Sequence, residues 1–131
     1  MADCLVLDTG ALIALERKNR IVASALRVAY DKRYRVLIPA VAYTEWVRGA
    51  TQGLGKRIEE IAILVGNERA VSRMAGEALR TLELDGREHL ADATVAACAR
   101  HYGGLLLTSD PGDMHRLLAA MSGNAVQVIT V

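Results

Sequence analysis

The sequence predicts an α/β fold in which a parallel β-sheet is flanked by helices on both faces. Short apolar runs typical of buried strands alternate with longer segments whose apolar residues recur at helical spacing. The 131 residues contain no linker, repeat or low-complexity tract, and 52% of them are hydrophobic against 24% charged. We therefore expect one domain over residues 1–131, since a single core commonly serves roughly 100–200 residues.

In the first half of the chain, turn residues and apolar spacing define the expected elements. Pro39 ends an apolar run because it cannot continue a central strand, and Gly49 closes a helix because it tolerates the backbone that follows one. In order, the expected elements are a strand at 5–7, a turn at 9–10, a helix from Ala11 to near Arg17, a helix at 21–30, a strand at 35–38 and a helix at 41–47.

The second half continues the alternation, with Asp85-Gly86 as its clearest turn signal. Residues 90–100 are strongly helical in pattern, and the paired glycines 103–104 end that helix. The expected elements are helices at 58–64, 70–82 and 90–100, a strand at 105–108, a helix at 114–121 and a last strand at 125–131.

Two aspartates stand where predicted strands end. Asp8 follows the first strand, and Asp110 follows the strand at 105–108. In open parallel sheets, ligands bind beyond the carboxyl ends of the strands. The predicted topology therefore places both carboxylates on the same rim of the sheet.

Two further acids lie inside apolar segments. Asp92 is surrounded by alanines, valine and leucine, and a buried carboxylate must be paired, neutralised or bound to a metal. A salt bridge to Arg48, Arg87 or Arg100, or an exposed edge of the helix, would also explain Asp92. Glu45, between Tyr43 and Trp46, could equally be a surface residue paired with Arg48.

Structural roles are also open for the strand-end acids. Asp110 could cap the helix that follows it, and Asp113 could favour the dipole of that helix's first turn. Asp8 could be a turn or cap residue. Each role is plausible alone, but four lone carboxylates in such settings favour one shared acidic centre.

An acidic centre of this kind predicts a hard divalent cation. Clustered carboxylates repel one another, whereas Mg²⁺ or Mn²⁺ takes carboxylate oxygens as ligands. The cysteines and histidines are scattered along the chain, which argues against zinc.

The composition predicts a cytoplasmic protein that does not span a membrane. No apolar run approaches the about 20 residues that cross a bilayer, and the N-terminus has no basic secretory region. Cys4 and Cys98 lie in apolar surroundings, which suits buried reduced thiols in the cytoplasm. The net charge of +1 hides basic clusters at 17–20, 32–35 and 56–57, which could bind phosphates or be solvated helix ends and turns.

Four segments in order resemble the PIN-domain family. They are VLDTGALIAL at 6–15, IPAVAYTEW at 38–46, ADATVAA at 91–97 and LTSDPGD at 107–113. Each motif is weak alone, but their order and spacing agree over essentially the whole chain. The short chain and its TSDPxD segment look most like VapC-type toxins of toxin–antitoxin pairs. The region between 54 and 84 aligns with no family motif.

The resemblance implies a metal-dependent endoribonuclease that hydrolyses RNA phosphodiester bonds with metal-activated water. It also implies Mg²⁺ or Mn²⁺ as cofactor, a cognate antitoxin and a homodimer. Carried onto this chain, Asp8, Asp92 and Asp110 would bind the metal, and Glu45 would bind it or orient its water. Thr108 or Ser109 would hydrogen-bond within the site, and Asp113 would support it. Candidates for holding the RNA backbone are the basic residues Arg17, Lys18, Arg48 and Arg116.

Three other interpretations remain. Asp8-Thr9-Gly10 is also the triplet of aspartic proteases, but those need β-rich lobes. A phosphatase with an aspartyl nucleophile could place Asp8 after the first strand, although it would want a second Asp where this chain has Gly10. A PIN-like subunit that only binds would keep the fold without activity. The RNA target, its cleavage sequence and the number of metal ions are left open.

Overall fold

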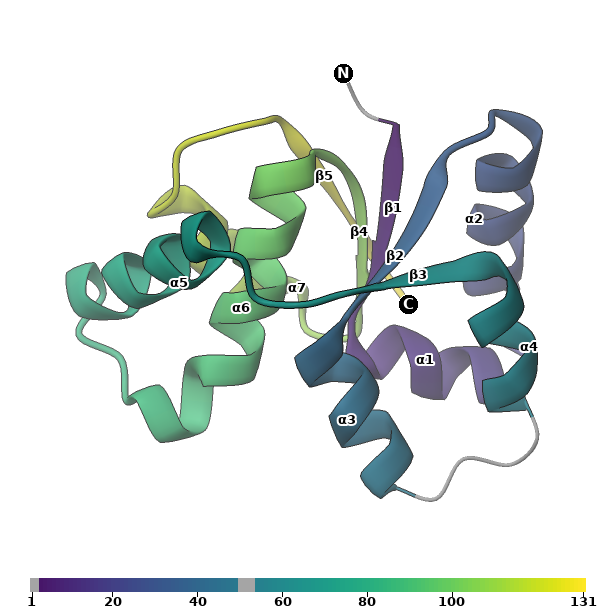
Figure 1. Ribbon diagram of the computed structural model, residues 1–131, viewed down its shortest axis with the longest axis horizontal. Helices are drawn as coiled ribbons and strands as arrows, with labels where there is room; N and C mark the ends of the chain where they lie inside the picture. Colours follow the sequence, from purple (N-terminus) through teal and green to yellow (C-terminus); the bar gives the residue numbers. More distant parts are fainter. Residues whose placement is uncertain (1–2, 50–53) are drawn as a thin grey trace.

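Five strands form one parallel sheet in the order β3-β2-β1-β4-β5 (Figure 1). This computed structural model describes residues 3–49 and 54–131. The strands are β1 (Cys4–Leu7), β2 (Arg35–Pro39), β3 (Ala62–Val65), β4 (Gly104–Thr108) and β5 (Val126–Thr130). The predicted α/β class and parallel sheet are confirmed.

The central strand β1 is buried along its whole length, because it has a neighbour on each side and helices over both faces. Val6 is in register with Leu37 of β2 and with Leu106 of β4. At the start of β4, Gly104 has φ +112, and a Cβ there would meet the backbone carbonyl of Cys4. A glycine is therefore required where these two strands come together.

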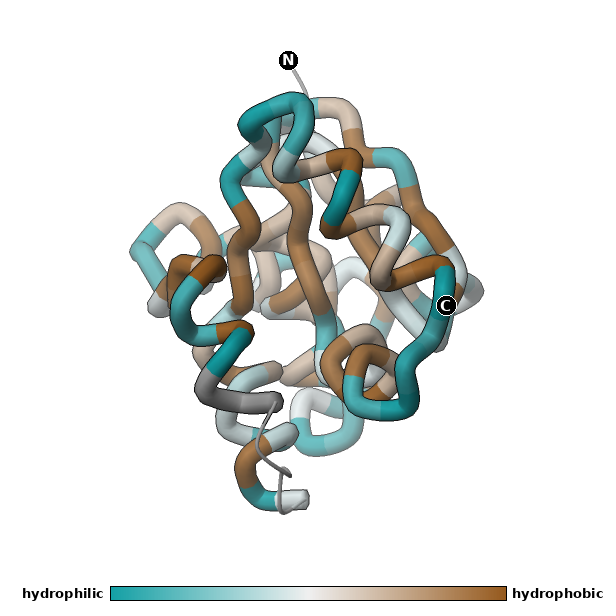
Figure 2. The backbone as a smooth tube through the Cα atoms, turned by 90° about the vertical axis from the view of Figure 1, so that its right-hand side faces the viewer, coloured by the Kyte–Doolittle hydropathy of each residue, from teal (hydrophilic) through white to brown (hydrophobic). Residues whose placement is uncertain are grey.

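Helices cover the sheet on both faces, as predicted. The helices are α1 (Thr9–Glu16), α2 (Arg20–Asp31), α3 (Ala40–Arg48), α4 (Leu54–Ile61), α5 (Arg69–Thr81), α6 (Gly86–Tyr102) and α7 (Pro111–Ala119). Alternate strand residues point to opposite faces, so Val6 packs with α5, α6 and α7, while Leu5 and Leu7 pack with α1 and α2. Figure 2 shows the apolar residues running along the strands, with hydrophilic residues at the turns.

Helix α3 crosses the end of the sheet between the two layers. Its Ala42 belongs to the core on the α6 side, and its Trp46 belongs to the core on the α1 side. Glu45 lies between these two anchors in the sequence. The packing of α3 therefore fixes the position of Glu45 at the rim of the sheet.

The predicted helix at 58–64 is wrong in its second half. Helix α4 ends at Ile61, and Ala62–Val65 forms strand β3 at the edge of the sheet, paired with β2. Ile63 and Leu64 are 50% and 51% exposed, so this strand buries little of its apolar surface. The short apolar run fits either periodicity, and backbone pairing with β2 selects the strand.

The predicted turn at 9–10 is also wrong, because α1 begins directly at Thr9 with Asp8 as its N-cap. Two other helices also begin earlier than predicted, each directly after an aspartate cap. Helix α6 begins at Gly86 after Asp85, and α7 begins at Pro111 after Asp110. An Asp cap starts the helix at the next residue, and proline is tolerated at the first helical position. No helix in the described part of the chain is long and apolar enough to cross a membrane.

Candidate metal centre

The four predicted acids line one cavity of about 250 Å³ at the carboxyl edge of the sheet. Asp8 follows β1 and Asp110 follows β4, while α3 carries Glu45 and α6 carries Asp92. Thr9, Gly10 and Ser109 complete the polar part of the wall. Residues as far apart in the sequence as Asp8 and Asp110 thus meet at one place.

Asp8 is the most buried acid of this cavity, with 6% of its surface exposed. Its Oδ1 accepts a hydrogen bond from the backbone N–H of Ala11 at 2.7 Å, which caps α1. Burial raises the pKa of the Asp8 carboxyl, and hydrogen bonds from Thr108 and Ala11 oppose that rise, while the nearby charge of Asp110 adds to it. The carboxylate is therefore held in a fixed orientation, although burial disfavours its charge.

Asp92 is half-buried and has no cationic partner among the residues that the structure describes. Of the three proposed partners, Arg100 instead donates to the carbonyls of Leu118 at 2.7 Å and Asn124 at 2.9 Å. Arg48 and Arg87 form no ion pair with it either. The salt-bridge explanation of Asp92 is therefore wrong.

The pKa of the Asp92 carboxyl is raised well above its ordinary value of 3.8. Burial and, to a smaller extent, the negative charges of four neighbouring carboxylates together raise the pKa of Asp92 to about 6. Those neighbours are, in decreasing order of effect, Asp110, Asp8, Asp113 and Glu45. The repulsion expected from the sequence is thus present at this position.

Asp110 and Asp113 lie together at the start of α7. Asp110 Oδ1 accepts from the backbone N–H of Asp113 at 3.4 Å, and its own N–H donates to Thr108 Oγ1 at 2.9 Å. Carboxylate oxygens of Asp92, Asp110 and Asp113 lie within 4.8 Å of one another. The proposed capping role of Asp110 is real, and it coexists with a place in the acidic cluster.

Glu45 is exposed at the mouth of the cavity. The Thr9 hydroxyl lies 3.5 Å from Glu45 Oε1 as a donor and 3.3 Å from the carbonyl of Ala42. No Glu45–Arg48 ion pair occurs in the described chain. The sequence prediction did not place Thr9 in the site, because it assigned this residue to a turn. A hydroxyl directly after a strand-end aspartate was the signal that could have identified it.

Gly10 sets the distance between α1 and the segment after β4. A Cβ on Gly10 would collide with the Ser109 hydroxyl and lie 2.7 Å from the Ser109 Cβ. Thr108 hydrogen-bonds to Asp8 and accepts from the backbone N–H of Asp110. Ser109 lines the cavity but forms no side-chain hydrogen bond with the described residues. Gly10 is therefore a second residue that the sequence analysis missed.

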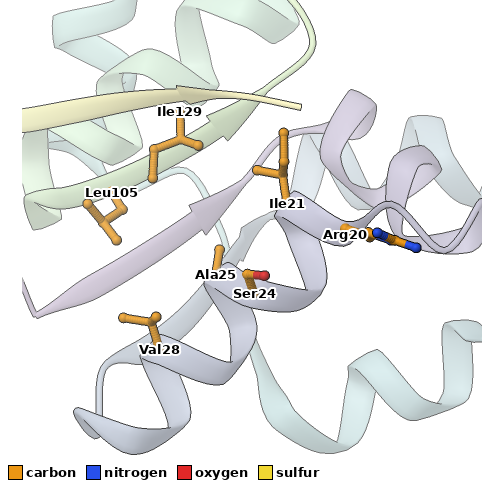
Figure 3. Close-up of a pocket in the computed structure, with 7 residues that line it drawn as sticks. All are labelled: Arg20, Ile21, Ser24, Ala25, Val28, Leu105 and Ile129. Atoms are coloured by element: carbon orange, nitrogen blue, oxygen red, sulfur yellow. The ribbon is translucent and has the colours of Figure 1, made fainter.

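A larger cavity, of about 360 Å³, lies elsewhere, between α2 and strands β4 and β5 (Figure 3). Ile21, Val28, Leu105 and Ile129 make its walls mostly apolar, and none of its lining residues is acidic. It offers no ligand set for a cation. The smaller acidic cavity is therefore the candidate metal centre.

The donor set of the acidic cavity fits a hard divalent cation. Its ionisable lining groups are carboxylates alone, and no cysteine or histidine of the described chain lines it. Oxygen-only sites suit Mg²⁺ or Mn²⁺. A bound cation would also relieve the repulsion that, together with burial, raises the pKa of Asp92.

The family model of the PIN domain matches residues 5–117, which is most of the chain and includes every acid of the cavity. The chain belongs to the PIN-domain family. Aspartic protease lobes are excluded, because Asp8-Thr9-Gly10 joins a parallel strand to a helix in this PIN domain.

Solved structures agree on the fold. The structure of VapBC2 from Rickettsia felis bound to a DNA fragment from their promoter superimposes with a TM-score of 0.68 at 14% identity, covering 96% of this chain and 98% of that one. The structure of FitAB bound to an IR36 DNA fragment gives a TM-score of 0.62 at 19% identity, with 95% and 94% covered. No curated protein sequence matches this PIN domain.

Proposed function

We propose that this PIN domain is a Mg²⁺- or Mn²⁺-dependent endoribonuclease and the toxin subunit of a type II toxin–antitoxin pair. The observation that carries the proposal is Asp92, which has no cationic partner among residues 3–49 and 54–131 and lies in a cavity whose ionisable lining groups are all carboxylates. Membership of a nuclease family supports the reaction class.

In this proposal, Asp8, Asp92 and Asp110, which line the cavity, would hold the cation, and Asp113 would join them because its carboxylate lies within 4.8 Å of those of Asp92 and Asp110. When bound, the cation supplies positive charge that neutralises the phosphate oxygens and acidifies water. The hydrogen bonds from Ala11 and Thr108 keep Asp8 oriented. Glu45, positioned by Thr9 at the mouth of the cavity, would orient the attacking water.

The test of the reaction is incubation of the purified protein with total RNA, in Mg²⁺ or Mn²⁺ and in EDTA. We expect internal cleavage with either metal and none in EDTA, and Asp8→Asn should abolish it. Full activity in EDTA would exclude the metal mechanism. Binding of RNA without cleavage in either metal would favour a binding subunit, and release of phosphate from monoesters would favour a phosphatase.

We further propose a small antitoxin that covers the acidic cavity, with an Arg or Lys of the partner pairing its carboxylates. The likeness to the VapBC2 and FitAB structures supports a partner of this kind. A homodimer and a cytoplasmic location complete the proposal, the latter supported by the buried free thiols of Cys4 and Cys98. Expression of the chain alone should arrest growth, and Asp8→Asn should relieve the arrest; normal growth with abundant soluble wild type would contradict the toxin role.

A further inference from the structure

The cavity of about 360 Å³ between α2 and strands β4 and β5 is an open groove with apolar walls (Figure 3). On its helix side, Ile21 and Val28 are 47% and 41% exposed. On its sheet side, Leu105 and Ile129 are half-buried, whereas Leu106, which points to the opposite face, is fully buried. The groove thus leaves apolar surface of the sheet accessible at β4 and β5 on the α2 face.

The order of the strands explains why this part of the sheet is bare. Helices α1 and α2 join β1 to β2, and α3 and α4 join β2 to β3, so these connections all lead away from β4. The connection from β4 to β5 runs in the opposite direction, and its helix α7 packs on the other face. Crossovers between parallel strands are right-handed, so a reversed direction places the helix on the opposite face. Within residues 3–49 and 54–131, the chain therefore supplies no crossover helix to the α2 face over β4 and β5.

Helix α2 itself carries more apolar surface than the sheet covers. Val22 and Ala29 are fully buried in the core on this face. Ile21, Ala25 and Val28 are spaced by four and three residues and line the groove. Residues at this spacing share one face of a helix. A second helix lying alongside α2 would therefore bury this stripe and the strand residues opposite it.

Positive charge borders the apolar stripe. Arg20 and Arg27 are exposed on α2, two helical turns apart, and neither forms an ion pair within the described chain. Arg20 lines the end of the groove, and Figure 3 shows its guanidinium directed away from the apolar walls. The single acid of α2, Asp31, is its last residue, and none of the groove's lining residues is acidic. Charge complementarity therefore favours a partner with acidic residues beside an apolar face.

We propose that this groove receives an acidic amphipathic helix of a partner protein. Its apolar face would lie on α2 and the two strands, and its carboxylates would lie beside Arg20 and Arg27. The docked helix would complete the layer that the crossovers leave unfinished. A second copy of this chain docked through its own α2 is disfavoured, because the arginines of the two helices would face one another.

This docking site is separate from the candidate metal centre. The groove and the acidic cavity share no lining residue. A partner held in the groove therefore leaves the carboxylates accessible, in contrast to the proposed antitoxin contact, which covers them. The inference concerns an interaction surface and does not depend on ribonuclease activity.

The binding test uses a fluorescent peptide of about 20 residues, which is long enough to form a helix alone. Leu at positions i, i+3, i+4 and i+7 gives the apolar face of a groove-binding helix, and Glu and Gln occupy the other face. A second peptide carries Lys in place of Glu. At low salt, we expect the Glu peptide to bind about tenfold more tightly than the Lys peptide, with the difference shrinking as KCl is added.

Variants of the groove are compared with matched variants elsewhere. Val28→Asn should raise the Kd of the Glu peptide about fivefold, because it removes apolar surface that docking would bury. Its control is Val47→Asn, since Val47 is an equally exposed helical valine outside the groove. Arg20→Gln should raise the Kd about threefold and weaken its salt dependence, as for an exposed ion pair. The control for this charge is Arg80→Gln on α5.

Equal Kd values for the Val28→Asn and Val47→Asn proteins would overturn the inference, as would equal binding of the Glu and Lys peptides. Absence of binding up to about 1 mM peptide would overturn it too. Sedimentation of the protein without peptide checks the alternative occupant. A dimer that Val28→Asn dissociates and Val47→Asn does not would assign the groove to a second copy instead.

Cleavage of RNA in the presence of saturating Glu peptide tests the separation from the acidic cavity. We expect the cleavage rate to be unchanged. Inhibition by the peptide that Val28→Asn relieves would show that the docked helix covers the centre, and would overturn the separation. Absence of cleavage even without peptide would contradict the proposed function and leave the binding result standing.

Discussion

Asp92 is a residue whose charge opposes folding of the metal-free protein. Its carboxylate is half-buried, faces the charges of Asp110, Asp8, Asp113 and Glu45, and has no cation beside it in the described chain. A structural ion pair would have the opposite property, because loss of one partner strands the other. The effect of removing this charge therefore separates a functional acid from a structural one.

Replacing Asp92 by Asn should abolish cleavage and leave the metal-free protein at least as stable as wild type. Asn keeps the size and hydrogen-bonding capacity of the side chain while removing the repulsion. Thermal melts in EDTA measure the stability, and the total-RNA assay measures activity. A mutant that is much less stable in EDTA and still cuts RNA would contradict this assignment.

The pH dependence of stability should report the same residue. The folded-state pKa of Asp92 is about 6, above the ordinary value of 3.8, so folding favours its protonated form. Below pH 3.8 this residue imposes no penalty; the penalty grows as pH rises from about 4 to about 6 and is complete above that. In EDTA, the stability of Asp92→Asn relative to wild type should thus increase over this window, by about 1–2 kcal/mol for a partly exposed group. A flat difference in urea titrations between pH 4 and 7 would contradict the repulsion.

Asp8 combines a structural and a proposed catalytic role, and two substitutions separate them. Asn is as good an N-cap as Asp, so Asp8→Asn should keep the bond to Ala11 N–H and the stability of the fold while losing cleavage. Asp8→Ala should lose cleavage and also about 0.5–2 kcal/mol of stability. Urea denaturation of the two variants measures the difference. Equal stabilities would show that the cap contributes nothing.

At the scale of elements, the fit between α1 and the segment after β4 depends on Gly10. Helix propensity alone would favour alanine there, but a Cβ would collide with Ser109. We expect Gly10→Ala to destabilise the protein by about 1–3 kcal/mol, the usual effect of overpacking, and to reduce cleavage by displacing the cavity wall.

The matched control is Gly76→Ala in α5, where nothing lies within 4 Å of an added Cβ; it should stabilise by about 0.5–1 kcal/mol. Chemical denaturation ranks the variants, and a Gly10→Ala protein as stable as Gly76→Ala would refute the close contact.

At the scale of the whole molecule, the cation should couple the layers that meet at the acidic cavity. The carboxylates lie after β1, on α3 and α6, and at the start of α7, so a cation bound by them stabilises only the assembled fold. Mg²⁺ or Mn²⁺ at a hundred times its Kd should add about 2.7 kcal/mol to the free energy of unfolding. Differential scanning calorimetry against EDTA, with KCl at matched ionic strength as control, measures the shift. The shift should shrink in Asp92→Asn; equal shifts in both proteins would place the cation elsewhere.

Much of the fold was predictable because its signals are local. Apolar runs at the positions of β1, β2, β4 and β5 predicted four strands, and the parallel topology they imply predicted that Asp8 and Asp110 lie on one rim. The edge strand β3 was not predictable in this way. Its residues have the apolar content of either element, and only pairing with β2 distinguishes them. The extent of the domain, residues 1–131, stays a prediction.

The identities and order of the four acids were set by the sequence alone, since their motifs are local and the strand ends position two of them. Only the tertiary structure decided what surrounds these acids. Arg100 donates to backbone carbonyls instead of pairing with Asp92, and Asp113 lies within 4.8 Å of Asp92 and Asp110. Arg17 lines a cavity that adjoins the acidic one. Ion pairing, burial and cavity walls depend on which distant segments pack together, here α6 against β1 and α7. Local periodicity carries no information about those distances, whereas charge repulsion and hydrogen bonding are determined by them.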